Sequence, residues 1–407
     1  RKIIKKRCNC STANSFWLAE LHKNINRFRR RKCKIHQIFE GNIMNDIPYS
    51  IKSFDHCELY VSNAKQTAFF YNTTMGFKTI AYRGLETGCR DKVSYVLQQG
   101  HIYLVITSPL KRNTKIGSHI DIHGDGIKDV AFNVDNAKIA WETSINRGAK
   151  SAMEPTKISD HNGEAIISAI HTFGDTIHTF IQRNNFNGVF LPGYMPFESN
   201  SNSKSSGLVH IDHIVGNQPN GEMQKTCDFY EKIFGWHRFW TVDDNDITTE
   251  YSSLRSIVMA NQNEKIKIPI NEPAKGLKKS QIQEFIDYYE TAGVQHLALS
   301  TKDIIQSVKV MRDNGVEFLP TPKSYYDNLL SRVGEINEDI DQLKNLGILV
   351  DSDENGYMLQ IFTKPLQDRP TLFFEIIQRK GSNSFGKGNF KALFKSIERE
   401  QKKRGNL

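Results

Sequence analysis

The strongest constraint on the fold of this chain of 407 residues is an internal repeat. Segment 53–56 ends in Asp-His, and segment 70–77 then carries an aromatic pair and a glycine; segments 210–213 and 229–236 repeat this pattern. In both copies an alternating apolar stretch predicts a strand and the aromatic pair lies in a predicted helix. The glycine suits the end of that helix, before a second strand.

Two more pairs of matching segments extend the repeat. Residues 126–132 match residues 293–299, and residues 179–183 match residues 375–379. The offset between the copies grows from 157 to 196 residues, so the second copy contains extra sequence. Part of that sequence, from Leu329 to Leu343, has apolar residues at three- and four-residue steps and predicts a helix. The repeat predicts two related α+β domains of strand–helix–strand units.

The net charge of +9 lies in the first 49 residues, which hold twelve basic and three acidic side chains. The other 358 residues hold 42 of each and are neutral. A nucleic-acid or anionic-membrane partner could therefore be argued for the extension alone. The extension fits a mitochondrial-type presequence, a basic arm, or non-native sequence upstream of Met44.

The extension also contains a weak imitation of a zinc site, formed by Cys8, Cys10, Cys33 and His36. Its C-x-C spacing differs from the usual C-x₂₋₄-C, so we expect no zinc there. No apolar run is long enough for a membrane-spanning helix. A Ser/Asn-rich tract at 198–206 has the composition of a flexible linker. We expect a disordered or non-native extension at 1–49, domains at 50–190 and 207–407, and a linker at 191–206.

The matched segments place candidate metal ligands in the second copy. At the matched positions the second copy has His213, His296 and Glu375. The first copy has His56, Asp129 and Thr179 there. Two imidazoles and one carboxylate can occupy one face of an octahedral ion, as in non-heme Fe(II) oxygenases. A lone histidine is more often structural, but Glu375 lies in an apolar stretch where an unpaired carboxylate is costly. We expect a metal in the second copy and none in the first.

Two other features have simpler explanations. Residues 381–388 nearly match the phosphate-binding pattern G-x-x-x-x-G-K-[ST], but Gly388 stands where a hydroxyl should hold Mg²⁺. The cluster of Lys275, Lys278 and Lys279 is typical of a solvated loop.

Many segments of the chain, in order, resemble the 4-hydroxyphenylpyruvate dioxygenases of the vicinal oxygen chelate superfamily. In the second copy they are 211–218, 250–256, 269–273, 279–283, 293–296, 359–365, 368–371, 385–390 and 404–407, and in the first copy 82–88. The resemblance runs from about residue 50 to residue 407. It implies two tandem vicinal-oxygen-chelate domains, each of paired βαβββ units forming a half-open barrel, with a C-terminal helix that closes over the site.

The same resemblance implies a function. The implied function is that of an Fe(II) enzyme in tyrosine catabolism. Such an enzyme converts the 2-oxo acid 4-hydroxyphenylpyruvate and O₂ to homogentisate and CO₂. His213, His296 and Glu375 are then the iron ligands. A homodimer in the cytoplasm is expected, with no nucleic-acid or membrane partner, although mitochondrial import through residues 1–49 stays open.

Carried over position by position, the resemblance also assigns the pocket. Its polar, catalytic wall is Ser256, Asn271, Gln281, Gln295 and Gln360. Amides and a hydroxyl can orient a phenol and a carboxylate without adding a charge that competes for iron. The substrate-binding side is apolar and aromatic apart from one amide, and consists of Pro269, Phe362, Phe385, Asn389, Phe390 and Phe394. Without the resemblance, the phenylalanines would be interpreted as core packing.

Four alternatives remain at the level of sequence. Hydroxymandelate synthase shares the fold, iron site and substrate but hydroxylates the benzylic carbon. An extradiol dioxygenase uses the same ligands on a catechol, against which the three glutamines argue. A non-catalytic ligand-binding protein on this fold would not need the complete ligand set. A nucleic-acid binder would act through the basic extension.

Deleting residues 1–43 is expected to leave turnover of 4-hydroxyphenylpyruvate unchanged, because every candidate site residue lies in the neutral part of the chain. Comparing kcat and KM of the full and shortened chains measures this. A large loss of kcat on deletion would give the extension a part in catalysis.

Overall fold

The computed structural model describes residues 47–198, 204–242, 253–274 and 276–406. Cys8, Cys10, Cys33 and His36 of the imitation zinc site lie outside these ranges, as does Lys275. Among the described helices, none combines the length and apolar character that a membrane span requires.

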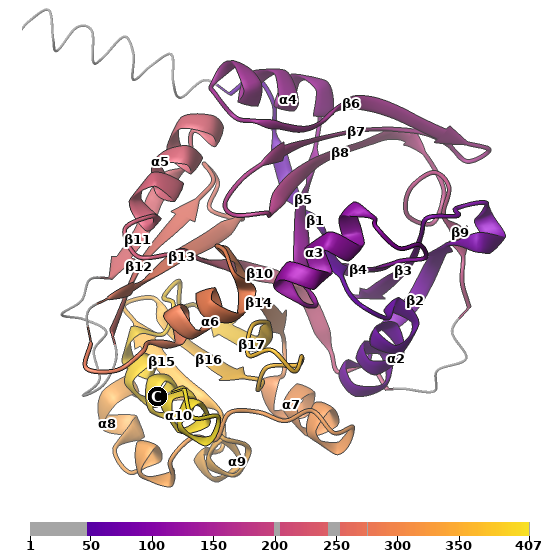
Figure 1. Ribbon diagram of the computed structural model, residues 1–407. Helices are drawn as coiled ribbons and strands as arrows, with labels where there is room; N and C mark the ends of the chain where they lie inside the picture. The colour runs from indigo at the N-terminus through magenta and orange to yellow at the C-terminus, as the bar shows by residue number, and fades with distance from the viewer. Residues whose placement is uncertain (1–46, 199–203, 243–252, 275, 407) are drawn as a thin grey trace, which may run out of the picture. The chain divides into compact units, whose positions relative to one another are not determined.

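The first copy of the repeat forms a nine-stranded sheet in the order β6-β7-β8-β5-β1-β4-β3-β2-β9 (Figure 1). Its strands are β1 (Ile51–Tyr60), β2 (Lys78–Arg83), β3 (Lys92–Gln99), β4 (Ile102–Pro109), β5 (Gly126–Val134), β6 (Ser151–Asp160), β7 (Gly163–His171), β8 (Ile177–Phe186) and β9 (Met195–Pro196). Helices α2 (Ala64–Met75) and α4 (Ala137–Asn146) follow β1 and β5, and α3 (Lys115–His123) joins the two βαβββ units. The short β9 pairs with β2 and falls within the expected linker.

The second copy forms an eight-stranded sheet with the same strand order. Its order is β15-β16-β17-β14-β10-β13-β12-β11. Each strand in this order corresponds to the strand at the same place in the series β6-β7-β8-β5-β1-β4-β3-β2 of the first sheet. The strands are β10 (Leu208–Asn217), β11 (His237–Val242), β12 (Ser253–Ala260), β13 (Lys267–Ala274), β14 (Gly293–Thr301), β15 (Leu349–Asp353), β16 (Gly356–Phe362) and β17 (Phe373–Lys380). The prediction of two tandem domains of paired βαβββ units, each curled into a half-barrel, is confirmed.

The helices of the second copy follow the first copy with additions. The equivalents of α2, α3 and α4 are α5 (Met223–Phe234), α6 (Gln281–Tyr289) and α7 (Ile304–Asp313), and the additions are η2 (Lys323–Tyr326), α8 (Leu329–Val333), α9 (Ile340–Leu346), η3 (Lys387–Asn389) and α10 (Phe390–Lys403). Both α2 and α5 end at the predicted glycines, Gly76 and Gly235, in the left-handed region.

The single helix predicted from Leu329 to Leu343 is wrong, because two short helices occupy this stretch. Gly334 ends α8 at a φ of 80°. The side chain of Asp339 then caps α9 by accepting a hydrogen bond from the Gln342 amide. The apolar spacing was real, but a glycine and an N-cap residue interrupt the helix between its apolar residues.

Candidate metal centre

Three neighbouring strands bring the candidate ligands to one face of the second sheet. Strand β14 lies between β10 and β17. Ala298 of β14 is in register with His213 on one side and Glu375 on the other. His296 precedes Ala298 by two residues and so faces the same way.

The ligand atoms of His213, His296 and Glu375 lie within 4.8 Å of one another. Glu375 Oε2 is 3.3 Å from His213 Nε2 and 3.5 Å from His296 Nε2. All three side chains are buried. The structure therefore brings the three predicted ligands together, and their binding of a metal stays a prediction.

The Nε2 atom of each histidine faces Glu375, and the Nδ1 atom has a hydrogen-bond partner that orients the ring. His213 Nδ1 is 2.8 Å from Asp212 Oδ1, and Arg379 donates two hydrogen bonds of 2.8 Å to the Asp212 carboxylate. His296 Nδ1 is 3.4 Å from Gln295 Oε1. Because carboxylate and amide oxygens only accept, both Nδ1 atoms carry a proton, and both Nε2 atoms face Glu375. Metal-bound histidines are commonly oriented in this way.

The electrostatics of the group fit a cation. Burial raises the pKa of Glu375, but the neighbouring His213 and His296 outweigh it and lower the pKa to about 2. That effect belongs to the protonated histidines; when both imidazoles are neutral, two Nε2 lone pairs and a carboxylate oxygen converge in a buried space and require a positive charge between them. One divalent ion satisfies all three, and two imidazoles with one carboxylate are a donor set suited to iron.

The free oxygen of Glu375 is held by a chain of amides. Gln360 Nε2 donates to Glu375 Oε1 over 3.3 Å, and Asn389 Nδ2 donates to Gln360 Oε1 over 3.1 Å. Gln360 comes from β16, and Asn389 from the end of η3, immediately before α10. Both were predicted pocket residues, and the structure connects them to the ligand.

The other predicted polar residues lie on separate elements of the same domain. Ser256 and Asn271 are cross-strand neighbours on β12 and β13, where Pro269 also lies. Gln281 begins α6. All of them, Pro269 included, are buried. The structure brings Gln295 and Gln360 into hydrogen-bond contact with the ligands, whereas for Ser256, Asn271 and Gln281 the pocket role stays a prediction.

Aromatic side chains surround the ligands. The Phe385 ring lies 5.1 Å from the His213 ring, and Phe362 lies 6.2 Å from His296. Phe394 and Phe390 pack in a cluster with Leu254, Ile282 and Trp240. Phe373, which was not predicted, stacks on His296 at 4.7 Å. Its position two residues before Glu375 on one strand was the signal that could have identified it.

Family models match both copies of the repeat. One, described as Hydroxyphenylpyruvate dioxygenase, HPPD, N-terminal, matches residues 45–190. Another, described as Glyoxalase/Bleomycin resistance protein/Dioxygenase superfamily, matches residues 210–361.

Known proteins named 4-hydroxyphenylpyruvate dioxygenase are similar over most of the chain. One from Aspergillus fumigatus is 49% identical, covering 88% of this chain and 94% of that protein. One from Tetrahymena thermophila is 50% identical, covering 87% of this chain and 91% of that protein. The chain belongs to the 4-hydroxyphenylpyruvate dioxygenase family.

A solved structure of a related enzyme has the same fold as this member of the 4-hydroxyphenylpyruvate dioxygenase family. It is a mutant of 4-hydroxymandelate synthase from Streptomyces coelicolor, with a TM-score of 0.77 and 31% identity, covering 86% of this chain and 99% of that one. The much higher identity to the dioxygenases favours the dioxygenase over the synthase.

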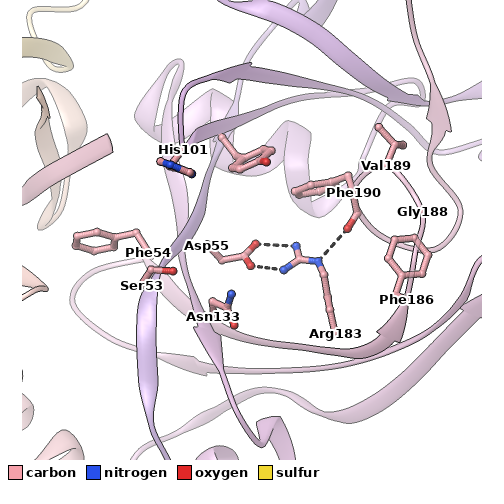
Figure 2. Close-up of a pocket in the computed structure, with 11 residues that line it drawn as sticks. Ser53, Phe54, Asp55, His101, Asn133, Arg183, Phe186, Gly188, Val189 and Phe190 are labelled. Carbon is pink, nitrogen blue, oxygen red and sulfur yellow. Dashed lines mark hydrogen bonds and ion pairs between the residues drawn. The ribbon is translucent and has the colours of Figure 1, made fainter. Parts of the chain in front are cut away.

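In this member of the dioxygenase family, the first copy keeps the arginine and aspartate that orient a ligand histidine. It does not keep all three metal ligands. Arg183 forms an ion pair with Asp55 (Figure 2). Asp55 Oδ1 lies 2.6 Å from His56 Nδ1. This repeats the Arg379–Asp212–His213 arrangement. Asp129 stands in the place of His296, and its carboxylate already accepts hydrogen bonds from the backbone and hydroxyl of Thr179.

The repeated aspartate and arginine were missed in the sequence, although the matched segments contained the signal. Asp-His occurs in both first segments and Gln-Arg in both last segments. Each Asp-His pair also coincides with a shift of strand register. A bulge of this kind re-aims a side chain and lets the aspartate reach its own histidine.

A second group of possible ligands occurs among the described residues, formed by His119, His123 and Asp175. There the carboxylate of Asp175 is 53% exposed. Both nitrogens of His123 already have acceptors, the Tyr289 carbonyl at 2.5 Å and Asp175 at 2.8 Å. The buried group at Glu375, with its anchored histidines, is the better metal site.

The phosphate-loop imitation at 381–388 has another role in the fold. The amides of Asn383 and Ser384 donate to Asp353, and the amide of Gly388 donates to Asp351. A phosphate would meet these two carboxylates instead of free N–H groups. The loop is tied to β15 and leads into α10.

Asp129→Asn is expected to remove a pH-dependent loss of stability. Burial raises the pKa of Asp129 to about 7, although His56 and Thr179 act in the opposite direction. Between about pH 4 and pH 7 the unfolded chain releases this proton and the folded chain keeps it. The free energy of unfolding of the wild type should fall over that range by about 3 kcal/mol relative to the variant.

Urea unfolding at a series of pH values measures this difference. Asp121→Asn is the control, because Asp121 is exposed. If wild type and Asp129→Asn have parallel pH profiles, the buried carboxyl is not the group that titrates.

Proposed function

We propose that this chain is an Fe(II)-dependent dioxygenase that converts 4-hydroxyphenylpyruvate and O₂ to homogentisate and CO₂ in tyrosine catabolism. The convergence of His213, His296 and Glu375 on one buried face carries the proposal. Family membership supports the substrate. Residues 207–407 are then the catalytic domain, and residues 50–190 are a domain without catalytic function.

His213, His296 and Glu375 would hold the iron by two neutral imidazole nitrogens and one carboxylate oxygen. Bound there, the ion supplies a Lewis acid for the 2-oxo acid and the electron transfer that O₂ requires. Asp212 and Gln295 keep the imidazoles in the tautomer that presents Nε2. Gln360 holds Glu375 Oε1, so that Oε2 stays directed at the histidines.

The remaining polar side chains are proposed to orient the organic substrate. Ser256, Asn271, Gln281 and Gln295 offer amide and hydroxyl groups, which can bind a phenol and a carboxylate at once. None of them is charged, so none competes with the iron for the carboxylate. Phe362, Phe385 and Phe390 supply flat apolar surfaces for the phenyl ring.

Helix α10 is proposed to exclude water. Phe390 and Phe394 pack against Trp240, Leu254 and Ile282, and so join α10 to β11, β12 and α6. The Arg404 guanidinium pairs with the buried carboxylate of Glu284 over 2.8 Å at the far end of the helix. A helix held at both ends can keep solvent away from the reacting atoms.

A homodimer and a cytoplasmic location are also proposed. Both rest on the resemblance to the family alone, and no contact between described residues is used to support them.

Product analysis of the Fe(II)-loaded full chain tests the proposed reaction. Homogentisate and CO₂ in equal amounts are expected from 4-hydroxyphenylpyruvate and O₂. His296→Ala should lower turnover by at least about 10³-fold, because it removes a ligand whose place no other side chain can take. Circular dichroism should show that this variant keeps its fold.

The reaction of the related synthase is the alternative to the proposed reaction. A synthase on the same fold would give hydroxymandelate from the same substrate. Hydroxymandelate without homogentisate, or full turnover by His296→Ala, would overturn the proposal.

A further inference from the structure

The second copy contains a segment that the first copy lacks. In the first copy α4 ends at Asn146 and β6 begins at Ser151, whereas in the second α7 ends at Asp313 and β15 begins at Leu349. The longer connection holds η2, α8 and α9. Its side chains contact the start of α10 and the cluster that contains Phe362 and Phe373.

Tyr325 of η2 joins this segment to the site by hydrogen bonds. Its hydroxyl lies 2.5 Å from Asn389 Oδ1 and 2.7 Å from the Val350 carbonyl, and it accepts a hydrogen bond from the Val350 amide over 2.8 Å. The hydroxyl has one proton, and Asn389 Oδ1 is the nearer acceptor. The Arg332 guanidinium lies 4.7 Å over the ring and holds it in place.

From Tyr325 a single line of hydrogen bonds reaches the metal centre. The hydroxyl donates to Asn389 Oδ1, Asn389 Nδ2 donates to Gln360 Oε1, and Gln360 Nε2 donates to Glu375 Oε1. Either amide could in principle be turned over. A hydroxyl donor at one end and an acceptor-only carboxylate at the other fix both amides in one orientation.

The same line joins the metal centre to the docking of α10. Asn389 immediately precedes α10. Gly386 before it has a φ of 77°, and a Cβ there would lie 2.0 Å from Gln360 Oε1. Only a glycine allows the loop to come this close. Asp351 and Asp353 of β15 tie down the same loop, so the loop, the amides and Glu375 form one connected unit.

We propose that Tyr325 is a positioning residue that acts through Asn389 and Gln360 to set the orientation of Glu375. The extra segment of the second copy exists to present this hydroxyl. The proposal deepens the proposed function and rests on it for the effect on turnover, although the effect on iron binding does not require the reaction.

Tyr325→Phe tests the proposal, with Tyr326→Phe as the matched control. Tyr326 is the next residue, is buried where Tyr325 is partly buried, and donates to the Ile348 carbonyl over 2.8 Å, away from the amide line. Fe(II) affinity measured without substrate should fall about tenfold in Tyr325→Phe and stay within about twofold of wild type in Tyr326→Phe. Because the hydrogen bond that orients Asn389 is lost, kcat should fall about tenfold in Tyr325→Phe alone.

A second variant covers the case in which Tyr325→Phe does not fold. Asn389→Ser breaks the line at its next member and leaves η2 untouched. It should lower Fe(II) affinity about tenfold. Where both single variants fold, the double variant should be no worse than Asn389→Ser, because both changes break the same line.

Three results would overturn the role of Tyr325. They are unchanged Fe(II) affinity in Tyr325→Phe, an equal loss in Tyr326→Phe, or additive losses in the double variant. If wild type binds Fe(II) but makes no homogentisate, the proposed reaction fails, while the affinity comparison still decides the role of Tyr325.

Discussion

The buried carboxylate of Glu375 is the constraint on which the rest of the catalytic half depends. Burial alone would favour its protonated form, yet two histidines within 3.5 Å lower its pKa to about 2. An ionised carboxylate inside an apolar sheet has to be surrounded by oriented partners. Asp212 and Gln295 orient the histidines, and Gln360 occupies the second oxygen.

This requirement explains why the two copies share a fold but differ in chemistry. Both keep the strand order, the bulge, the aspartate and the arginine. The first copy replaces a histidine by Asp129 and the glutamate by Thr179, and the two substitutes hydrogen-bond to each other. The second copy keeps the ligand set and has extra sequence after α7. The Tyr325 hydroxyl of that extra sequence hydrogen-bonds to Asn389, which in turn holds Gln360 against Glu375.

The repeat made most of the fold predictable from sequence. Matched segments carried the strands, the glycines that end α2 and α5, and the three ligands, since residues at equivalent positions of a repeat lie on equivalent strands. The prediction of one helix from Leu329 to Leu343 failed because apolar spacing does not register a glycine in the left-handed region. The line from Tyr325 to Glu375 depends on contacts between distant segments. No local pattern records such contacts.

The central claim is that one copy of a duplicated domain holds one metal ion. Equilibrium binding of Fe(II) to the full chain without oxygen measures this most directly. One ion per chain is expected, lost in Glu375→Ala and kept in Thr179→Ala. Two ions per chain, or one that survives Glu375→Ala, would contradict the assignment of the ligands.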